Sequence, residues 1–448
     1  MSTRFVREGQ PVYLHYGAFE STKLGTSGTD ILGTTHHIER WRSDLEMLDG
    51  AGIRHVRYSV PWHRIERKHD SFDFSWLDGP MKYMREQSIT PVLDPVHHIS
   101  FPDWLENGFA NPEFPALYER FLRQVAERYP WADCYTVFNE PLPTTLFCSY
   151  TGWWYPHQAS DRHFVSMALN VARSICRASA MLERHNSATR FYHMETCEAH
   201  RAVDKKCEEW AGFANVRRFV MHDLILGAVD REHPAYGYLT QNGASEDDLQ
   251  WLRDHRTRID VLGLDYYIQS EIEWYWDKDL GRANISWPVS NPVGFNSVAQ
   301  EYASRFKVPV MLGETNLRGT PRDRLTWLKF MEEQCEQLAA KTDFRGFCWY
   351  PSIDSTDWCN FCNEATGTVD PQGIWSLGPD RWTRYPSELS AAYTRLANGL
   401  ARSKDLPAWE FSAAAARNTS GYRRLMNHWP SWQSQPAESE RSPKVAAG

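Results

Sequence analysis

The feature that most constrains the fold of this chain is a regular alternation of short apolar segments with amphipathic segments over about its first 400 residues. The apolar segments predict eight strands, at residues 11–19, 53–60, 89–96, 133–139, 189–196, 259–267, 308–314 and 344–351. Helical spacing of apolar residues predicts helices between them, at 37–52, 74–88, 112–130, 162–185, 323–341 and 386–399, with a looser helical region at 201–229. Several strands are apolar on both faces, which is typical of buried parallel strands.

Strands that alternate with helices through right-handed crossovers form either a doubly wound sheet or a closed barrel. Eight units favour the barrel. A doubly wound fold would carry a glycine-rich phosphate turn after an early strand, and the segment YGAFESTKLGTSG does not match G-x-G-x-x-G. We therefore predict an α/β fold, a (β/α)8 TIM barrel, in which residues 1–400 form a single catalytic domain.

The alternating pattern ends near residue 401, where the sequence becomes rich in Ser, Ala, Pro and charged residues. We expect residues 401–448 to form a C-terminal tail that is partly disordered over about its last dozen residues. The Trp and Leu residues that precede this end are suited to docking on the barrel.

The composition narrows the classes of partner. Lys and Arg number 49 against 57 Asp and Glu, a formal charge of −8, which argues against nucleic acid or an anionic membrane as the main partner. No signal peptide and no segment of about 20 apolar residues is apparent, so we expect a soluble cytoplasmic protein. The single Cys359-x-x-Cys362 motif lacks a second half, and we predict no metal and no cofactor. The sequence has no signature of an oligomeric state.

Two glutamates come directly after buried strands. Glu140 follows DCYTVFN and Glu314 follows VPVMLG, and a glutamate at the mouth of such a strand is costly to bury without a partner. In a barrel, the chemistry lies at the carboxyl ends of the strands. Paired carboxylates with aromatic walls suit glycoside hydrolysis, and the chain has 20 Trp, 20 Tyr and 21 Phe. Neither a phosphate-binding loop nor G-x-S-x-G is present, which disfavours phosphoryl transfer and serine hydrolysis.

Several motifs resemble those of the retaining (β/α)8 glycosidases, most closely the β-glucosidase-like family 1 glycoside hydrolases. The resemblance spans about residues 12–400 and rests on GIRHVRYSVPWHRIE, PVLDPVHHISFPDWLENGFANPEF, TVFNEP, DVLGLDYY, VMLGETN and GFCWYPSIDSTDW. It implies that Glu140 is the general acid/base and Glu314 the nucleophile. It further implies that Asn139 binds the hydroxyl next to the anomeric carbon and that Arg57 and Tyr267 hold Glu314. The residues that it implies for the sugar pocket are His98, Trp349, Asp357 and Trp358.

The sequence departs from the family at the rim that binds sugar. Glu20 stands closest to the position where the family usually has Gln, Asp265 where it usually has Asn, and Asp357 where it usually has Glu. We count Glu20 among the substrate-binding candidates. The added acidity disfavours anionic sugars such as sugar phosphates or uronic acids as substrates.

The leading hypothesis is a retaining β-glycosidase that acts by double displacement on a small carbohydrate or glycoside, with the two carboxyl groups about 5–5.5 Å apart. The alternatives are a sugar-binding barrel that has lost turnover and a transglycosidase that acts on a small-molecule glycoside. Trp153 and Trp154, in the segment 143–161, either wall the aglycone side or pack on the barrel rim.

Overall fold

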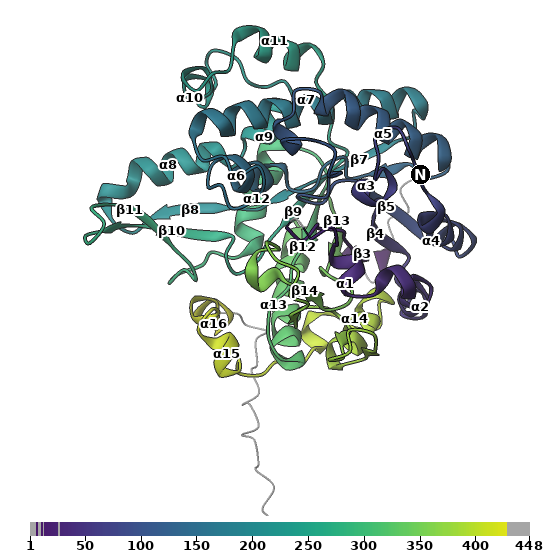
Figure 1. Cartoon of the computed structure of the whole chain (residues 1–448). Coiled ribbons are helices and arrows are strands. Elements are labelled where there is room, and N and C mark those ends of the chain that lie inside the picture. The colour runs from purple at the N-terminus through teal and green to yellow at the C-terminus, as the bar shows by residue number, and fades with distance from the viewer. Residues whose placement is uncertain (1–5, 8–9, 12, 26, 428–448) are drawn as a thin grey trace, which may run out of the picture.

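The computed structural model describes residues 6–7, 10–11, 13–25 and 27–427. Its centre is a closed barrel of parallel strands, as predicted (Figure 1). In spatial order around the barrel the strands are β12 (Val310–Glu314), β13 (Phe344–Cys348), β3 (Leu14–Phe19), β4 (His55–Ser59), β5 (Thr90–Asp94), β6 (Cys134–Tyr135), β7 (Arg190–Thr196) and β9 (Val261–Asp265). Each lies within one of the eight predicted strand segments.

Helices follow the strands and cover the outside of the barrel. The longer ones are α2 (His37–Gly50), α4 (Ser75–Glu86), α5 (Phe114–Arg128), α7 (Asp161–His185), α12 (Phe295–Phe306), α13 (Pro321–Ala339) and α14 (Glu388–Ala397). Shorter helices are α1 (Ile31–Thr34), α3 (Trp62–Ile65), α9 (Val220–Ile225), α10 (Tyr236–Gln241) and α11 (Glu246–Asp254). Within the described ranges, no helix has the length and apolar character needed to cross a bilayer.

Side-chain alternation along the strands produces two apolar layers. One set of strand residues packs inside the barrel: Tyr16, Val92, Tyr192, Met194, Met311 and Cys348. Their neighbours in sequence point outward and join the larger core beneath the helices: Leu93, Phe191, Leu312 and Phe347. This alternation decides which residues near the strand ends can face the barrel mouth.

Some elements were missed by the sequence analysis. A small sheet of β8 (Ala199–Ala202), β10 (Glu271–Asp277) and β11 (Arg282–Ser286) extends from one side of the barrel next to α8 (Glu208–Arg217) (Figure 1). The strand predicted at 133–139 is regular only over β6, and α6 (Pro141–Ser149) begins directly after it. The strand is interrupted because the chain bends at residues 137–138. Asn139 then pairs with His97 through an isolated parallel bridge.

The tail packs against the barrel as far as it is described. It contains a short turn of helix at Ser403–Asp405, then α15 (Ala413–Ala416) and α16 (Ser420–Asn427), which lie near α13 (Figure 1). Ser412 Oγ donates to Asp323 Oδ2 at 2.7 Å, and the buried Tyr422 ring contacts Trp327 edge-on at 5.1 Å. Docking of the region before the chain end is therefore observed. The last dozen residues, where we expected disorder, belong to the segment 428–448, which lies outside the described residues.

Candidate active site

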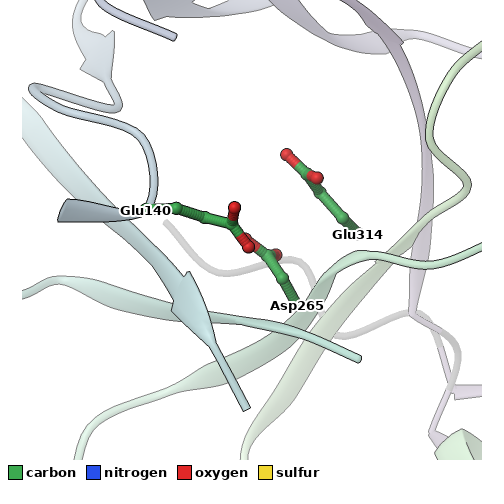
Figure 2. Close-up of side chains that lie close together, drawn as sticks. All are labelled: Glu140, Asp265 and Glu314. Atoms are coloured by element: carbon green, nitrogen blue, oxygen red, sulfur yellow. The ribbon is translucent and has the colours of Figure 1, made fainter. Parts of the chain in front are cut away.

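Three buried carboxyl groups meet at the mouth of the barrel. Glu314 ends β12, Asp265 ends β9, and Glu140 precedes α6. Figure 2 shows their side chains extending from three parts of the rim toward one space. One oxygen of each lies within 4.8 Å of an oxygen of the other two. Among the described residues, this is the group spaced to hold a metal ion, and Cys359 and Cys362 do not belong to such a group.

Glu314 is held by two hydrogen-bond donors. Arg57 Nη1 donates to its Oε1 at 2.6 Å, and the Tyr267 hydroxyl donates to its Oε2 at 2.7 Å. Arg57 is itself fixed, because Nη1 also donates to the Gly313 carbonyl at 3.0 Å and Nη2 donates to Asn139 Oδ1 at 2.6 Å. Charge-assisted bonds of this kind are short and strong. They orient the Glu314 carboxyl and stabilise negative charge on it.

Glu140 has a different environment. Its backbone is in the left-handed region, with φ 43°, and its N–H donates to the Met194 carbonyl at 3.0 Å. Pro141, which follows it, is the first residue of α6, a position that suits proline. Burial raises the pKa of Glu140 well above its usual value, and the negative charges of Glu314 and Glu195 add to this effect.

His98 lies beside Glu140, with Nε2 at 3.7 Å from its Oε2. The other ring nitrogen, Nδ1, is 3.0 Å from Thr144 Oγ1. Burial lowers the pKa of His98 well below its usual value, and the positive charges of His97 and Arg57 lower it further. The imidazole is therefore neutral at physiological pH and gives Glu140 no cationic partner.

His97 was passed over by the sequence analysis in favour of its neighbour. Its Nδ1 is 2.6 Å from Asp94 Oδ2, and its Nε2 is 3.8 Å from Glu20 Oε2. Burial alone would lower the pKa of His97, but the charges of Glu20 and Asp94 outweigh it and raise that pKa to about 9. An adjacent His pair at a strand end was the available signal, since consecutive side chains there point in different directions.

Glu20 directly follows β3, and its carboxylate is already engaged. Oε2 accepts from the backbone N–H of Thr22 at 2.5 Å and from its hydroxyl at 2.6 Å, and Oε1 accepts from the Tyr350 hydroxyl. The Tyr350 ring also stacks on His97, with ring centroids 5.8 Å apart. Tyr350 therefore faces the barrel mouth and was missed by the sequence analysis.

Two of the predicted sugar-pocket residues point elsewhere. Trp349 packs in the outer core, and its Nε1 donates to the Gln372 carbonyl at 2.8 Å, because alternation along the chain turns Tyr350 inward instead. Asp357 is fully buried, and its carboxylate accepts from the backbone N–H groups of residues 366, 367 and 368. The expectation that Trp349 and Asp357 line the sugar pocket is corrected accordingly: one is core, and the other organises a loop.

An aromatic cluster continues outward from His98. Its ring centroid is 5.4 Å from that of Trp358 and 5.0 Å from that of Trp154. The two tryptophans of the 143–161 segment separate in role, since Trp154 is buried and Trp153 is 49% exposed. Trp153 stacks on Phe147 at 5.0 Å, which contacts Trp154 edge-on at 5.1 Å. These contacts form a chain of aromatic rings that runs from the buried His98 to the exposed Trp153.

A closed parallel barrel with acidic residues at the carboxyl ends of its strands is typical of (β/α)8 enzymes. The sequence model of the family described as glycosyl hydrolase family 1 matches residues 9–284. The chain therefore belongs to glycosyl hydrolase family 1 and is an enzyme of the glycoside hydrolase class.

Individual relatives are distant. Beta-glucosidase A of Thermotoga maritima is 19% identical over 377 residues, covering 74% of this chain and 81% of the relative. The 1,4-beta-D-glucan glucohydrolase of Thermotoga neapolitana is 21% identical over 285 residues, 56% of this chain and 64% of the relative. The solved structure of the T. maritima beta-glucosidase in complex with azafagomine has a TM-score of 0.73 at 15% identity, covering 88% of this chain and 99% of that one. This likeness establishes a shared fold.

Proposed function

We propose that the protein is a retaining β-glycosidase in which Glu140 is the general acid/base and Glu314 is the nucleophile. The observation that carries this proposal is the contrast between two neighbouring buried carboxyl groups. Glu314 is bound by Arg57 and Tyr267, whereas burial raises the pKa of Glu140 and no cation pairs with it among the described residues. Environments that separate two carboxyl groups in this way assign one to carry charge and the other to carry a proton.

The spacing of the two groups supports retention of configuration. Retaining enzymes place their carboxyl groups about 5–5.5 Å apart, whereas inverting enzymes leave about 6.5–9.5 Å for a water molecule. Oxygens of Glu140 and Glu314 within 4.8 Å of each other fit the shorter distance. No cofactor is needed for this chemistry.

The reaction then proceeds in two displacements. Glu140 gives its proton to the glycosidic oxygen while that oxygen leaves the anomeric carbon, and Glu314 forms a bond to the same carbon. In the second step Glu140 takes a proton from water, whose oxygen displaces Glu314. Arg57 and Tyr267 keep Glu314 aimed at the anomeric carbon through both steps.

For substrate recognition we propose contacts from Asn139, His98 and Trp358. In support, Asn139 Oδ1 accepts a hydrogen bond from Arg57, and His98 lies beside both Glu140 and the Trp358 ring. A β-glucoside is the first substrate to consider, since relatives of this chain carry the names beta-glucosidase and glucan glucohydrolase. The Glu20 carboxylate accepts hydrogen bonds from Thr22 and Tyr350. Its proposed role is either to hold these residues in place around the pocket or to accept hydrogen bonds from sugar hydroxyls in their stead. The barrel, residues 1–400, is proposed as the catalytic domain.

The test combines two variants with a panel of aryl glycosides that differ in sugar and anomer. Glu314→Gln should reduce hydrolysis to near the uncatalysed rate. Glu140→Gln should retain formation of the glycosyl-enzyme only with leaving groups that need no proton, and added azide should speed its breakdown. NMR of the first product formed should show the starting anomer. Hydrolysis by Glu314→Gln at the wild-type rate, or an inverted product, would overturn the proposal.

The same panel separates the alternatives. Binding of a glycoside by calorimetry with no turnover of any substrate would favour a sugar-binding barrel. Transfer of the sugar to an added alcohol in preference to water would favour a transglycosidase.

A further inference from the structure

Asp265 is a buried carboxyl group that pairs with no cation in the described part of the chain. It is 0% exposed and lies at the last position of β9, between β7 and β12. Its backbone is fixed, because its carbonyl accepts from the Cys197 N–H at 2.9 Å. Its side chain packs tightly on Gly313, where an added Cβ would lie 2.3 Å from Asp265 Oδ1. The carboxyl group therefore cannot turn toward solvent.

Neither oxygen of Asp265 accepts a hydrogen bond from an N–H or O–H group of the described residues. A buried ionised carboxylate without donors is strongly disfavoured and takes up a proton instead. An oxygen of the Glu140 carboxyl group lies within 4.8 Å of an oxygen of Asp265, and Figure 2 shows the two groups converging. Two carboxyl groups can bond to each other only when at least one of them is protonated.

We propose that Asp265 is a positioning residue that stays protonated at neutral pH and donates its hydrogen to the Glu140 carboxylate whenever Glu140 has given up its own proton. This inference rests on the proposed acid/base role of Glu140. It adds to that role a hydrogen bond that strengthens as negative charge develops on Glu140.

The proton count through the reaction is conserved. Both carboxyl groups begin protonated. When the Glu140 proton moves to the glycosidic oxygen and the carbon–oxygen bond breaks, Glu140 becomes a carboxylate and accepts a hydrogen bond from Asp265. When water later gives a proton back to Glu140, the pair returns to its first state. Asp265 keeps its proton throughout.

The surroundings of Asp265 support the protonated form. Burial raises its pKa well above the usual value, and the charges of Glu314 and Glu140 raise it further, against smaller lowering influences from Arg57 and His97. Arg57 is committed to Glu314 and Asn139, and His97 to Asp94, so neither pairs with Asp265. The other titratable groups that face it from neighbouring elements are Glu195, Cys197, Tyr267 and Cys348.

The experiment compares Asp265→Leu, which has a similar shape and no donor, with Asp265→Asn, which keeps a donor. The readout is the alkaline limb of the pH profile of kcat/KM, which reports the loss of the acid proton from Glu140. Without the donor the Glu140 carboxylate is less stable, so the limb should move upward in Asp265→Leu by about one pH unit or more. In Asp265→Asn the shift should be much smaller. Asp260→Asn, which changes a carboxyl group just before the start of the same strand, should leave the limb in place.

Three results would overturn the proposal. A downward shift in both Asp265 variants would show that the side chain is an ionised carboxylate that repels charge on Glu140. An unchanged limb with only a lower melting temperature would show a structural role. The third result comes from infrared spectra of the wild type and Asp265→Asn at neutral pH. If both spectra have the same protonated-carboxyl bands, Asp265 carries no proton. The infrared measurement needs no turnover. An inactive wild-type protein would therefore refute the proposed function, while the infrared spectra would still decide whether Asp265 is protonated.

Discussion

Replacement of His97 by Gln should remove a pH-dependent part of the stability of the protein. His97 is 1% exposed and lies between Asp94 and Glu20, whose charges hold its pKa at about 9 in the folded state, against 6.5 for an ordinary histidine. A group whose pKa is raised on folding stabilises the folded state fully below its unfolded pKa and loses this contribution as the pH rises through the folded value. The window is therefore between pH 6.5 and about 9.

The magnitude follows from the difference between the two pKa values. At 1.36 kcal/mol per unit, the rise in the pKa of His97 from 6.5 to about 9 corresponds to about 3 kcal/mol of unfolding free energy. Two other histidines leave this window undisturbed. Burial lowers the pKa of His55 and of His193 to about 4, so both are neutral in the folded and unfolded states above their ordinary pKa.

The assay is urea unfolding of the wild type, His97→Gln and the control His185→Gln, whose side chain is exposed, at several pH values from about 6 to about 10. The wild type and the control should lose about 3 kcal/mol more than His97→Gln across that range. Parallel stability curves for the wild type and His97→Gln would refute the reasoning, because they would mean that His97 has the same proton affinity in the folded and unfolded states.

Three further outcomes follow from the structure. Tyr422→Ala should lower the free energy of unfolding by about 3 kcal/mol, because it leaves a cavity at a fully buried site between the tail and α13. Urea unfolding of the variant and the wild type measures this difference. Tyr350→Phe should raise KM for glycosides, because the hydroxyl that binds Glu20 is lost, whereas Trp349→Phe should lower the melting temperature and leave KM nearly unchanged. Equal effects on KM would contradict the assignment of Tyr350 to the pocket. Trp153→Ala should raise KM by about three- to tenfold for aryl aglycones and much less for methyl glycosides, as expected for the loss of one aromatic stacking surface.

The fold was predictable because strand and helix periodicity is a local property of the sequence. All eight strands of the barrel were anticipated, and the closed order that they adopt follows from the number of alternating units. The small sheet of β8, β10 and β11 was missed because β8 pairs with β10 across a distant part of the chain, and because the local pair of β10 and β11 presents mixed polar and aromatic faces. Their pattern reflects packing against α8 and the rim and has no clean periodicity of its own.

The carboxyl groups at the mouth were predictable as residues, since a Glu that ends an apolar strand is visible in sequence. It was harder to predict which neighbouring side chains face these carboxyl groups. Trp349 and Tyr350 are adjacent, and a difference of one position decides between core and pocket. Asp357 was expected to bind sugar. The sequence does not reveal that a later loop folds back so that the backbone N–H groups of residues 366–368 donate to the Asp357 carboxylate.

The positions of the cations explain how similar carboxyl groups acquire different properties. Among the residues that the structure describes, carboxyl groups outnumber cations at this mouth. Two buried cations there are already committed: Arg57 to Glu314, and His97 to Asp94 and Glu20. Glu140 and Asp265 are left without one, and burial raises the pKa of each. In the proposed mechanism, the proton needed for acid catalysis stays on Glu140 because burial disfavours its charged form and no cation pairs with it among the described residues. A cation introduced beside Glu140 would stabilise its carboxylate and remove that proton, so the absence of a positive charge next to Glu140 is as necessary to the proposed chemistry as the Arg57 contact is to Glu314.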